Sequence, residues 1–171
     1  VILGSRSSSD FADVPAGIGG GWDGFRGTPE LVYMFDYQDN ENPKADEILD
    51  KRGIFYDKHR SIDITTSVTG TFTTEGWSVY KFTNLRSDGQ PGSNTTFPDT
   101  DFPMFRLADV YLMYAEAVAR GGQGGSMATA VGYVNALRQR AYGDTFHGIN
   151  ESWLRENDFR NLLDERAREL Y

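Results

Sequence analysis

The side chains best suited to bind a ligand gather in a glycine-rich stretch near the start of the chain, residues 20–27. Trp22 and Phe25 lie there beside Asp23 and Arg26, with glycines on both sides that leave the rings sterically accessible. Aromatic rings can stack on the C–H faces of sugars, while carboxylate and guanidinium groups hydrogen-bond to hydroxyls. The loop therefore indicates a carbohydrate-binding surface. The alternative is a Trp22 that packs against the protein interior, because Trp is highly buried on average.

A second aromatic candidate for the same surface is Trp77, which begins a strand-like run. Apolar and polar residues alternate from Ile62 to Val68 and again from Trp77 onward, which predicts two or three short antiparallel strands between residues 54 and 83. Trp77 would lie at the end of such a strand. The expected ligand-binding residues are Trp22, Asp23, Phe25, Arg26 and Trp77.

Residue spacings typical of catalysis or metal binding are absent from the sequence. His59 and His147 lie far apart, and neither belongs to a zinc-binding pattern. The glycines at 121–125 lack the Lys and Ser/Thr of a phosphate-binding loop. Glu165 and Glu169 share a helical face, as a glycosidase acid and base could, but they alternate with arginines, which favours ion pairing between helices. We therefore predict no catalytic residue, no metal and no cofactor.

The segment 36–50 carries six carboxylates and few apolar residues. Ca²⁺ prefers several oxygen ligands, so a calcium site is one hypothesis for this segment. The spacing does not match an EF-hand loop, and a solvated acidic face is the favoured interpretation.

Composition excludes several classes of protein. The net charge of −8 argues against nucleic acid as a partner, since such proteins neutralise phosphates with clustered Lys and Arg. The absence of cysteine excludes a disulfide framework and a thiolate metal site. No stretch approaches the roughly 18 apolar residues of a membrane span, and Val1–Leu3 lacks the charged region of a signal peptide.

Residues 101–171 are expected to form three amphipathic helices. The first begins after Pro103, has an apolar stripe that includes Leu107, Val110, Tyr111 and Tyr114, and stops at Gly121. The second begins at the N-cap Ser126 and ends before Gly143, and the third runs from about Asn157. Earlier in the chain, Thr28-Pro29-Glu30 predicts the start of a short helix, and a second short helix is expected between Pro43 and Leu49.

Helices with one apolar stripe must pack against one another, so a helical hairpin array with short turns is expected. The fold class is mainly α, with long loops and a small antiparallel β element. Residues 1–100 would be a loop-rich region with short helices and a β-hairpin, and residues 101–171 the helical array of the same domain. The last helix reaches Tyr171 without a cap, so we expect a fragment truncated at both ends.

Three motifs carry a resemblance to a known family. Residues 101–117 (DFPMFRLADVYLMYAEA), 130–141 (AVGYVNALRQRA) and 163–171 (LDERARELY) resemble, in order and spacing, the C-terminal signature of the SusD-like (RagB/SusD) family. Trp22-Asp23-Gly24 and the helix after it resemble an earlier motif of the family. Asp50-Lys51-Arg52 is similar to an Asp-Pro-Arg motif, with Lys in place of Pro.

The resemblance implies a non-enzymatic, lipid-anchored protein at the surface of the cell outer membrane, with a tetratricopeptide-like (TPR-like) helical scaffold. Such a protein would serve polysaccharide utilization and nutrient uptake by capturing an oligosaccharide or polysaccharide for a TonB-dependent SusC-like transporter. Its only membrane contact would be the lipid anchor, on a missing N-terminal part. The alternative is a helical-repeat scaffold for protein interaction that binds no sugar of its own. Exposure of Trp22 separates the two hypotheses.

Overall fold

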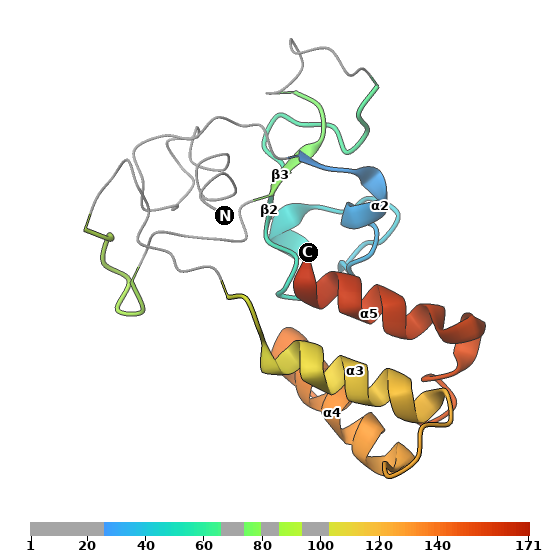
Figure 1. The fold of residues 1–171 in the computed structure, drawn as a ribbon. Coiled ribbons are helices and arrows are strands. Elements are labelled where there is room, and N and C mark those ends of the chain that lie inside the picture. Colours follow the sequence, from blue (N-terminus) through green and yellow to red (C-terminus); the bar gives the residue numbers. More distant parts are fainter. Residues whose placement is uncertain (1–25, 66–73, 80–85, 94–102) are drawn as a thin grey trace. The chain divides into compact units, whose positions relative to one another are not determined.

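The computed structural model describes residues 26–65, 74–79, 86–93 and 103–171 (Figure 1). The chain divides into two compact units. The sheet unit consists of residues 1–49 and 53–102, and the helical unit consists of residues 50–52 and 103–171. Three of the predicted ligand-binding residues, Trp22, Asp23 and Phe25, lie outside the described residues.

The sheet unit is built on three short antiparallel strands in the order β1-β3-β2. They are β1 (Arg26–Gly27), β2 (Phe55–Tyr56) and β3 (Trp77–Val79). Arg26 lies opposite Ser78, and Phe55 lies opposite Val79. The prediction of strands between residues 54 and 83 is confirmed for β2 and β3. The interpretation of residues 20–27 as a loop is wrong for β1. There Gly27 lets the backbone approach Phe55, since a Cβ at this position would lie 3.4 Å from the Phe55 ring.

Aromatic side chains form the core beneath this sheet. The short helix α2 (Pro29–Val32) begins where Thr28-Pro29 predicts it, and its Val32 is buried with Phe35 and Tyr37. Phe35 packs edge-on against Phe55 at a centroid distance of 5.5 Å, and the Tyr37 hydroxyl donates to the Val32 carbonyl at 3.1 Å. The second expected short helix is a single 3-10 turn, η1 (Ala45–Glu47).

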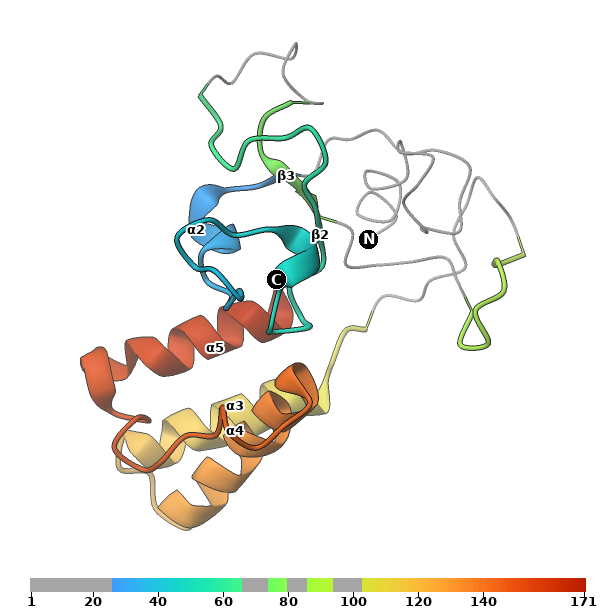
Figure 2. The same cartoon turned by 180° about the vertical axis from the view of Figure 1, so that it is seen from behind.

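The helical unit contains the three helices that the sequence predicts, which confirms a mainly α fold with a small antiparallel sheet. They are α3 (Leu107–Ala119), α4 (Met127–Tyr142) and α5 (Arg160–Leu170), the last preceded by the 3-10 turn η3 (Glu156–Phe159). Helices α3 and α4 form a hairpin, and α5 packs along α3 (Figures 1 and 2). In the part of the chain that the structure describes, no helix combines the length and apolar character needed to cross a bilayer.

The buried face of α3 differs from the predicted stripe. Leu107 and Val110 are 64% and 50% exposed, whereas Leu112, three alanines and Val118, which also belongs to the predicted stripe, face the core. The alanines are Ala108, Ala115 and Ala119. Helix α3 is apolar around most of its circumference, so periodicity alone cannot select the packed face. Tyr111 and Tyr114, which were expected in the core, are partly buried against it.

Local signals at the ends of α4 are confirmed in detail. The Ser126 hydroxyl accepts a hydrogen bond from the Thr129 amide at 3.1 Å, and Gly143 follows the helix at φ 83°, in the left-handed conformation of a C-cap.

Replacing Ser126 with alanine is expected to lower the free energy of unfolding by about 1 kcal/mol, because the Thr129 amide loses its capping acceptor. Chemical denaturation followed by circular dichroism measures this change. Ser87, an exposed serine of the sheet unit, provides the control as Ser87→Ala. An unchanged stability for Ser126→Ala would show that the cap contributes nothing.

Candidate functional site

Trp77 lies in the core of the sheet unit, with only 2% of its surface exposed. Its ring meets Tyr37 edge-on at a centroid distance of 6.0 Å and lies 6.1 Å from the ring of Phe55. The ring therefore presents no exposed face to a ligand in this structure. Alternation along a strand shows that one face is buried, but it does not show which side chains form that face.

Arg26 lies on β1, directly after the predicted aromatic loop. Its Nη1 donates to the carbonyl oxygen of Glu75 at 3.3 Å, and its side chain is half-buried. The pairing of β1 with β3 brings Arg26 next to the strand of Trp77. The aromatic core thus fixes the position of the residue that follows the loop.

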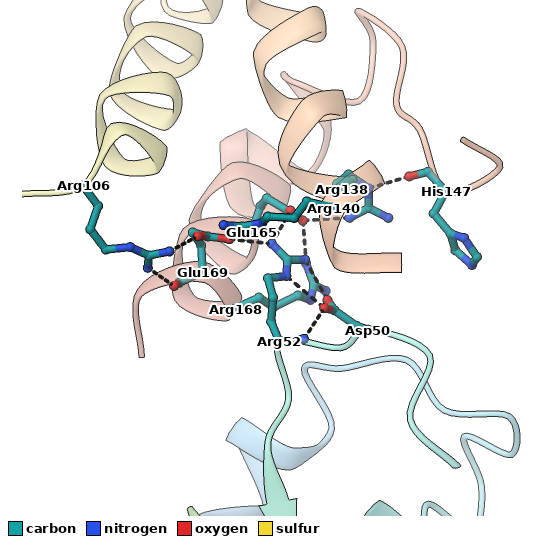
Figure 3. Close-up of polar contacts among 9 residues, drawn as sticks. All are labelled: Asp50, Arg52, Arg106, Arg138, Arg140, His147, Glu165, Arg168 and Glu169. Carbon is teal, nitrogen blue, oxygen red and sulfur yellow. Dashed lines mark hydrogen bonds and ion pairs between the residues drawn. The ribbon is translucent and has the colours of Figure 1, made fainter. Parts of the chain in front are cut away.

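A buried cluster of charged side chains occupies the helical unit (Figure 3). Its centre is the pair formed by Asp50 and Arg52, which are 0% and 9% exposed. Arg52 donates to both carboxylate oxygens of Asp50, from Nε at 2.9 Å and from Nη2 at 2.7 Å. The interpretation of segment 36–50 as a solvated acidic face is therefore wrong for Asp50, because this carboxylate has a bidentate guanidinium partner in the interior.

The same guanidinium extends the cluster to α5. Arg52 Nη1 lies 2.7 Å from Glu165 Oε1 and 3.4 Å from Glu169 Oε2, and both glutamates are buried. Burial alone would lower the pKa of Arg52, but its hydrogen bonds to Asp50 and the charge of Glu165 raise the pKa above its usual range. The Tyr171 hydroxyl donates to the Arg52 carbonyl at 2.7 Å, which anchors the segment at the end of α5.

Further arginines surround the two glutamates from neighbouring helices. Arg138 on α4 lies 2.7 Å from Glu165, and Arg106, just before α3, lies 2.6 Å from Glu169. Arg140 also pairs with Glu169, and Arg168 lies 3.4 Å from Glu165. The prediction that Glu165 and Glu169 form ion pairs between helices is confirmed.

Spacing along a helix predicts two i, i+4 ion pairs, Glu116 with Arg120 and Asp164 with Arg168, and only the first forms among the described residues. Glu116 pairs with Arg120 at 2.8 Å, as its i, i+4 spacing predicts, and not with Arg138, the other suggested partner. Asp164 pairs with Arg160 at 3.4 Å instead of with Arg168. Arg168 pairs with Glu165, on the buried side of α5.

The chemistry open to this cluster is limited by its burial. A general acid or base must lie within hydrogen-bond reach of a substrate, and the carboxylates of Asp50, Glu165 and Glu169 are turned into the protein and contacted by guanidinium groups. The cluster therefore holds the segment 50–52 against α4 and α5.

Within residues 26–65, 74–79, 86–93 and 103–171, no three His, Cys, Asp or Glu side chains come together as a metal site would require. The acidic segment 36–50, for which calcium was one hypothesis, lies inside these ranges. His147 stacks on Tyr142 at 4.0 Å, and its Nδ1 lies 2.9 Å from Asp144, which lowers the pKa of that carboxyl. His147 is therefore a loop residue that packs on α4.

A cavity of about 260 Å³ lies between the end of α3 and the start of α5. On one side it is bounded by Asn157, Asp158 and Phe159, whose φ angles are 53°, 52° and 64°. Positive φ in a residue other than glycine costs about 1–3 kcal/mol, and such strain concentrates at functional sites. Sequence reasoning missed this turn. Its only signal is the Asn-Asp pair, since these residues tolerate the left-handed conformation best.

A family model described as "SusD family" matches residues 61–171. The chain belongs to the SusD family. The matched region contains all three long helices, the cavity and the glutamates of the charged cluster, whereas Asp50 and Arg52 precede it.

A curated relative of this SusD-family chain is the starch-binding protein SusD of Bacteroides thetaiotaomicron. The two sequences are 46% identical over 99 residues, which are 57% of this chain and 16% of the relative. The chain therefore spans about one sixth of the length of the relative it matches.

Proposed function

We propose that this chain is part of a cell-surface glycan-binding protein that captures oligosaccharides without transforming them. The observation that supports the proposal is membership of the SusD family over residues 61–171, together with similarity to a relative named as starch-binding. We further propose that the captured glycan passes to a TonB-dependent SusC-like transporter, and that the intact protein is held at the outer membrane by a lipid anchor. The helical unit would belong to a tetratricopeptide-like scaffold.

The proposed ligand face is the aromatic loop that ends at β1. Trp22 and Phe25 would supply stacking surfaces, and Asp23 and Arg26 would hydrogen-bond to sugar hydroxyls. The described part of this face is consistent with that role, since Arg26 is half-buried on a strand fixed by the aromatic core. Trp77 supports the face from the core instead of contacting the ligand.

Capture by stacking suits a protein that must release its ligand to a transporter. Stacking and exposed hydrogen bonds add small increments of free energy, and a factor of ten in affinity corresponds to about 1.4 kcal/mol. The charged cluster does not take part in binding under this proposal. Its role is to keep the segment 50–52 fixed to α4 and α5.

Replacing Trp22 with alanine is expected to weaken oligosaccharide binding at least about tenfold, because the ligand loses an aromatic stacking surface. Isothermal titration calorimetry of the chain with maltoheptaose, xylohexaose and a host N-glycan measures the affinity, and circular dichroism checks that the variant is folded. Tyr33, an exposed aromatic residue outside the proposed face, provides the control as Tyr33→Ala. Saturable binding that Trp22→Ala leaves unchanged would exclude this loop as the site, and binding to none of the sugars would favour a protein-interaction scaffold.

A further inference from the structure

The cavity between α3 and α5 has features that the charged cluster and the aromatic loop do not explain. It is lined by the end of α3, by the left-handed turn at 157–159 and by the first turn of α5. Its volume of about 260 Å³ lies just below the 300–1,000 Å³ typical of pockets for drug-sized ligands. The cavity therefore suits one small ring and is too small for an oligosaccharide.

The left-handed turn is held in place from several directions. Asn157 donates to the Asn161 side chain at 3.0 Å, and Asn161 donates to the Trp153 carbonyl at 3.2 Å. The guanidinium of Arg120 lies over the ring of Phe159, 4.2 Å from its centroid. Three successive non-glycine residues with positive φ are costly, and a phenylalanine tolerates this conformation poorly. The turn directs both an aromatic ring and polar side chains to the cavity wall, a placement that a simple connection between helices does not require.

The lining combines apolar and polar groups. Phe159 and Leu163 supply apolar surface, and Asn157 supplies a side-chain amide that can donate and accept hydrogen bonds. Asp158 is exposed, and among the described residues its carboxylate has no hydrogen-bond or ion-pair partner. Its two oxygens can accept hydrogen bonds from two adjacent hydroxyl groups.

The charge of the cavity lining favours neutral sugars over acidic ones. The two arginines of the lining are already paired, Arg120 with Glu116 at 2.8 Å and Arg160 with Asp164 at 3.4 Å. The carboxylate of Asp158 is thus the uncompensated charge at the cavity. It would repel an acidic sugar, whereas a neutral sugar would donate hydroxyl hydrogens to it.

We propose that this cavity is an accessory subsite for one neutral pyranose ring, separate from the aromatic loop. The inference rests on the proposed function, because a carbohydrate ligand is assumed. Asp158 accepts hydrogen bonds from two vicinal hydroxyls, and the exposed side chain of Leu163 contacts the apolar side of the sugar ring.

The test is an NMR titration of the full chain, labelled with ¹⁵N, with D-glucose and with D-glucuronate. Glucose is expected to shift the amide signals of residues 157–160 and Arg120 in a saturable manner, and glucuronate to bind these residues at least about threefold more weakly. Asp158→Asn keeps the turn and is expected to weaken glucose binding about fivefold, since the charge and one acceptor are lost. Glu151→Gln, an exposed carboxylate outside the cavity lining, should leave it unchanged.

The outcomes separate this inference from the proposed function. If an oligosaccharide binds to the chain while glucose leaves the amides of residues 157–160 unmoved, the subsite is disproved and the proposed function stands. If glucose shifts these amides but Asp158→Asn binds as tightly as the wild type, the assigned role of Asp158 is overturned. If neither glucose nor any oligosaccharide binds, the proposed function and the subsite both fail.

Discussion

Replacing Arg52 with alanine is expected to lower the free energy of unfolding by about 3–5 kcal/mol, the cost of removing one partner from a buried ion pair. Arg52 makes the bidentate contact with Asp50 and also reaches Glu165 at 2.7 Å. Without it, the fully buried Asp50 would have no guanidinium partner. The pair itself need not be worth this much, because the loss comes mainly from leaving a charge unpaired in the interior.

Urea denaturation followed by the helical circular dichroism signal measures the Arg52→Ala effect. The matched control is Arg86→Ala, which removes a guanidinium that pairs with Asp88 at 3.2 Å at the surface, and we expect a change within about 0.5 kcal/mol. A second variant, Asp50→Ala, tests the coupling. If the two core residues form one pair, the double variant loses less stability than the sum of the single variants. Additive effects, or a loss no larger than that of Arg86→Ala, would contradict a central role for the pair.

Replacing Trp77 with alanine is expected to destabilise the sheet unit by about 3–5 kcal/mol, the usual cost of truncating a buried aromatic residue. The ring is 2% exposed and contacts Tyr37 and Phe55, so truncation leaves a cavity at the centre of the aromatic core. Phe35 and Val32, packed in the same core, would lose support as well. The same variant separates a core role from a ligand-binding role.

The Trp77 prediction is checked by thermal and chemical denaturation of Trp77→Ala beside Trp77→Phe. The phenylalanine variant keeps an aromatic ring in the core and should retain more than half of the lost stability. Tyr33→Ala, at an exposed site, should change the stability by no more than about 0.5 kcal/mol. A Trp77→Ala protein with normal stability but weaker glycan binding would show that the ring meets the ligand, contrary to its position in the core.

Local features were the most predictable from the sequence. Helix α4 begins after Ser126 and ends before Gly143 as expected, because an N-cap hydroxyl and a C-cap glycine act on the few residues beside them. The start of α2 at Pro29 follows from the same kind of signal. The i, i+4 pair of Glu116 and Arg120 also lies within one helix.

Long-range features were less predictable, because they depend on which elements meet. Arg52 and Glu165 are 113 positions apart. The resemblance of Asp50-Lys51-Arg52 to a family motif singles out Asp50, but no pattern in segment 36–50 shows that its carboxylate is buried. Alternation indicated strands near Trp77, but not that its ring would be the buried one. On α3, apolar residues lie on most sides of the helix, so periodicity did not show which face would pack against the core.

The candidate ligand face stays a prediction, because Trp22, Asp23 and Phe25 lie outside the described residues. Residue types in the aromatic loop indicated a ligand face, and the structure adds that Arg26 is fixed on β1. The cavity beside α5 was not predictable, because it depends on positive φ angles at Asn157, Asp158 and Phe159 that no sequence pattern requires.

A protein that captures oligosaccharides without turnover releases them chemically unchanged, and this property can be measured directly. The intact protein that contains this chain is titrated calorimetrically with a panel of neutral oligosaccharides that includes maltoheptaose, and the sugar is then recovered and analysed by mass spectrometry. We expect saturable binding of at least one oligosaccharide and its recovery at unchanged mass. Shortened products would show turnover instead of capture, and an intact protein that binds no sugar of the panel would overturn the proposed glycan binding.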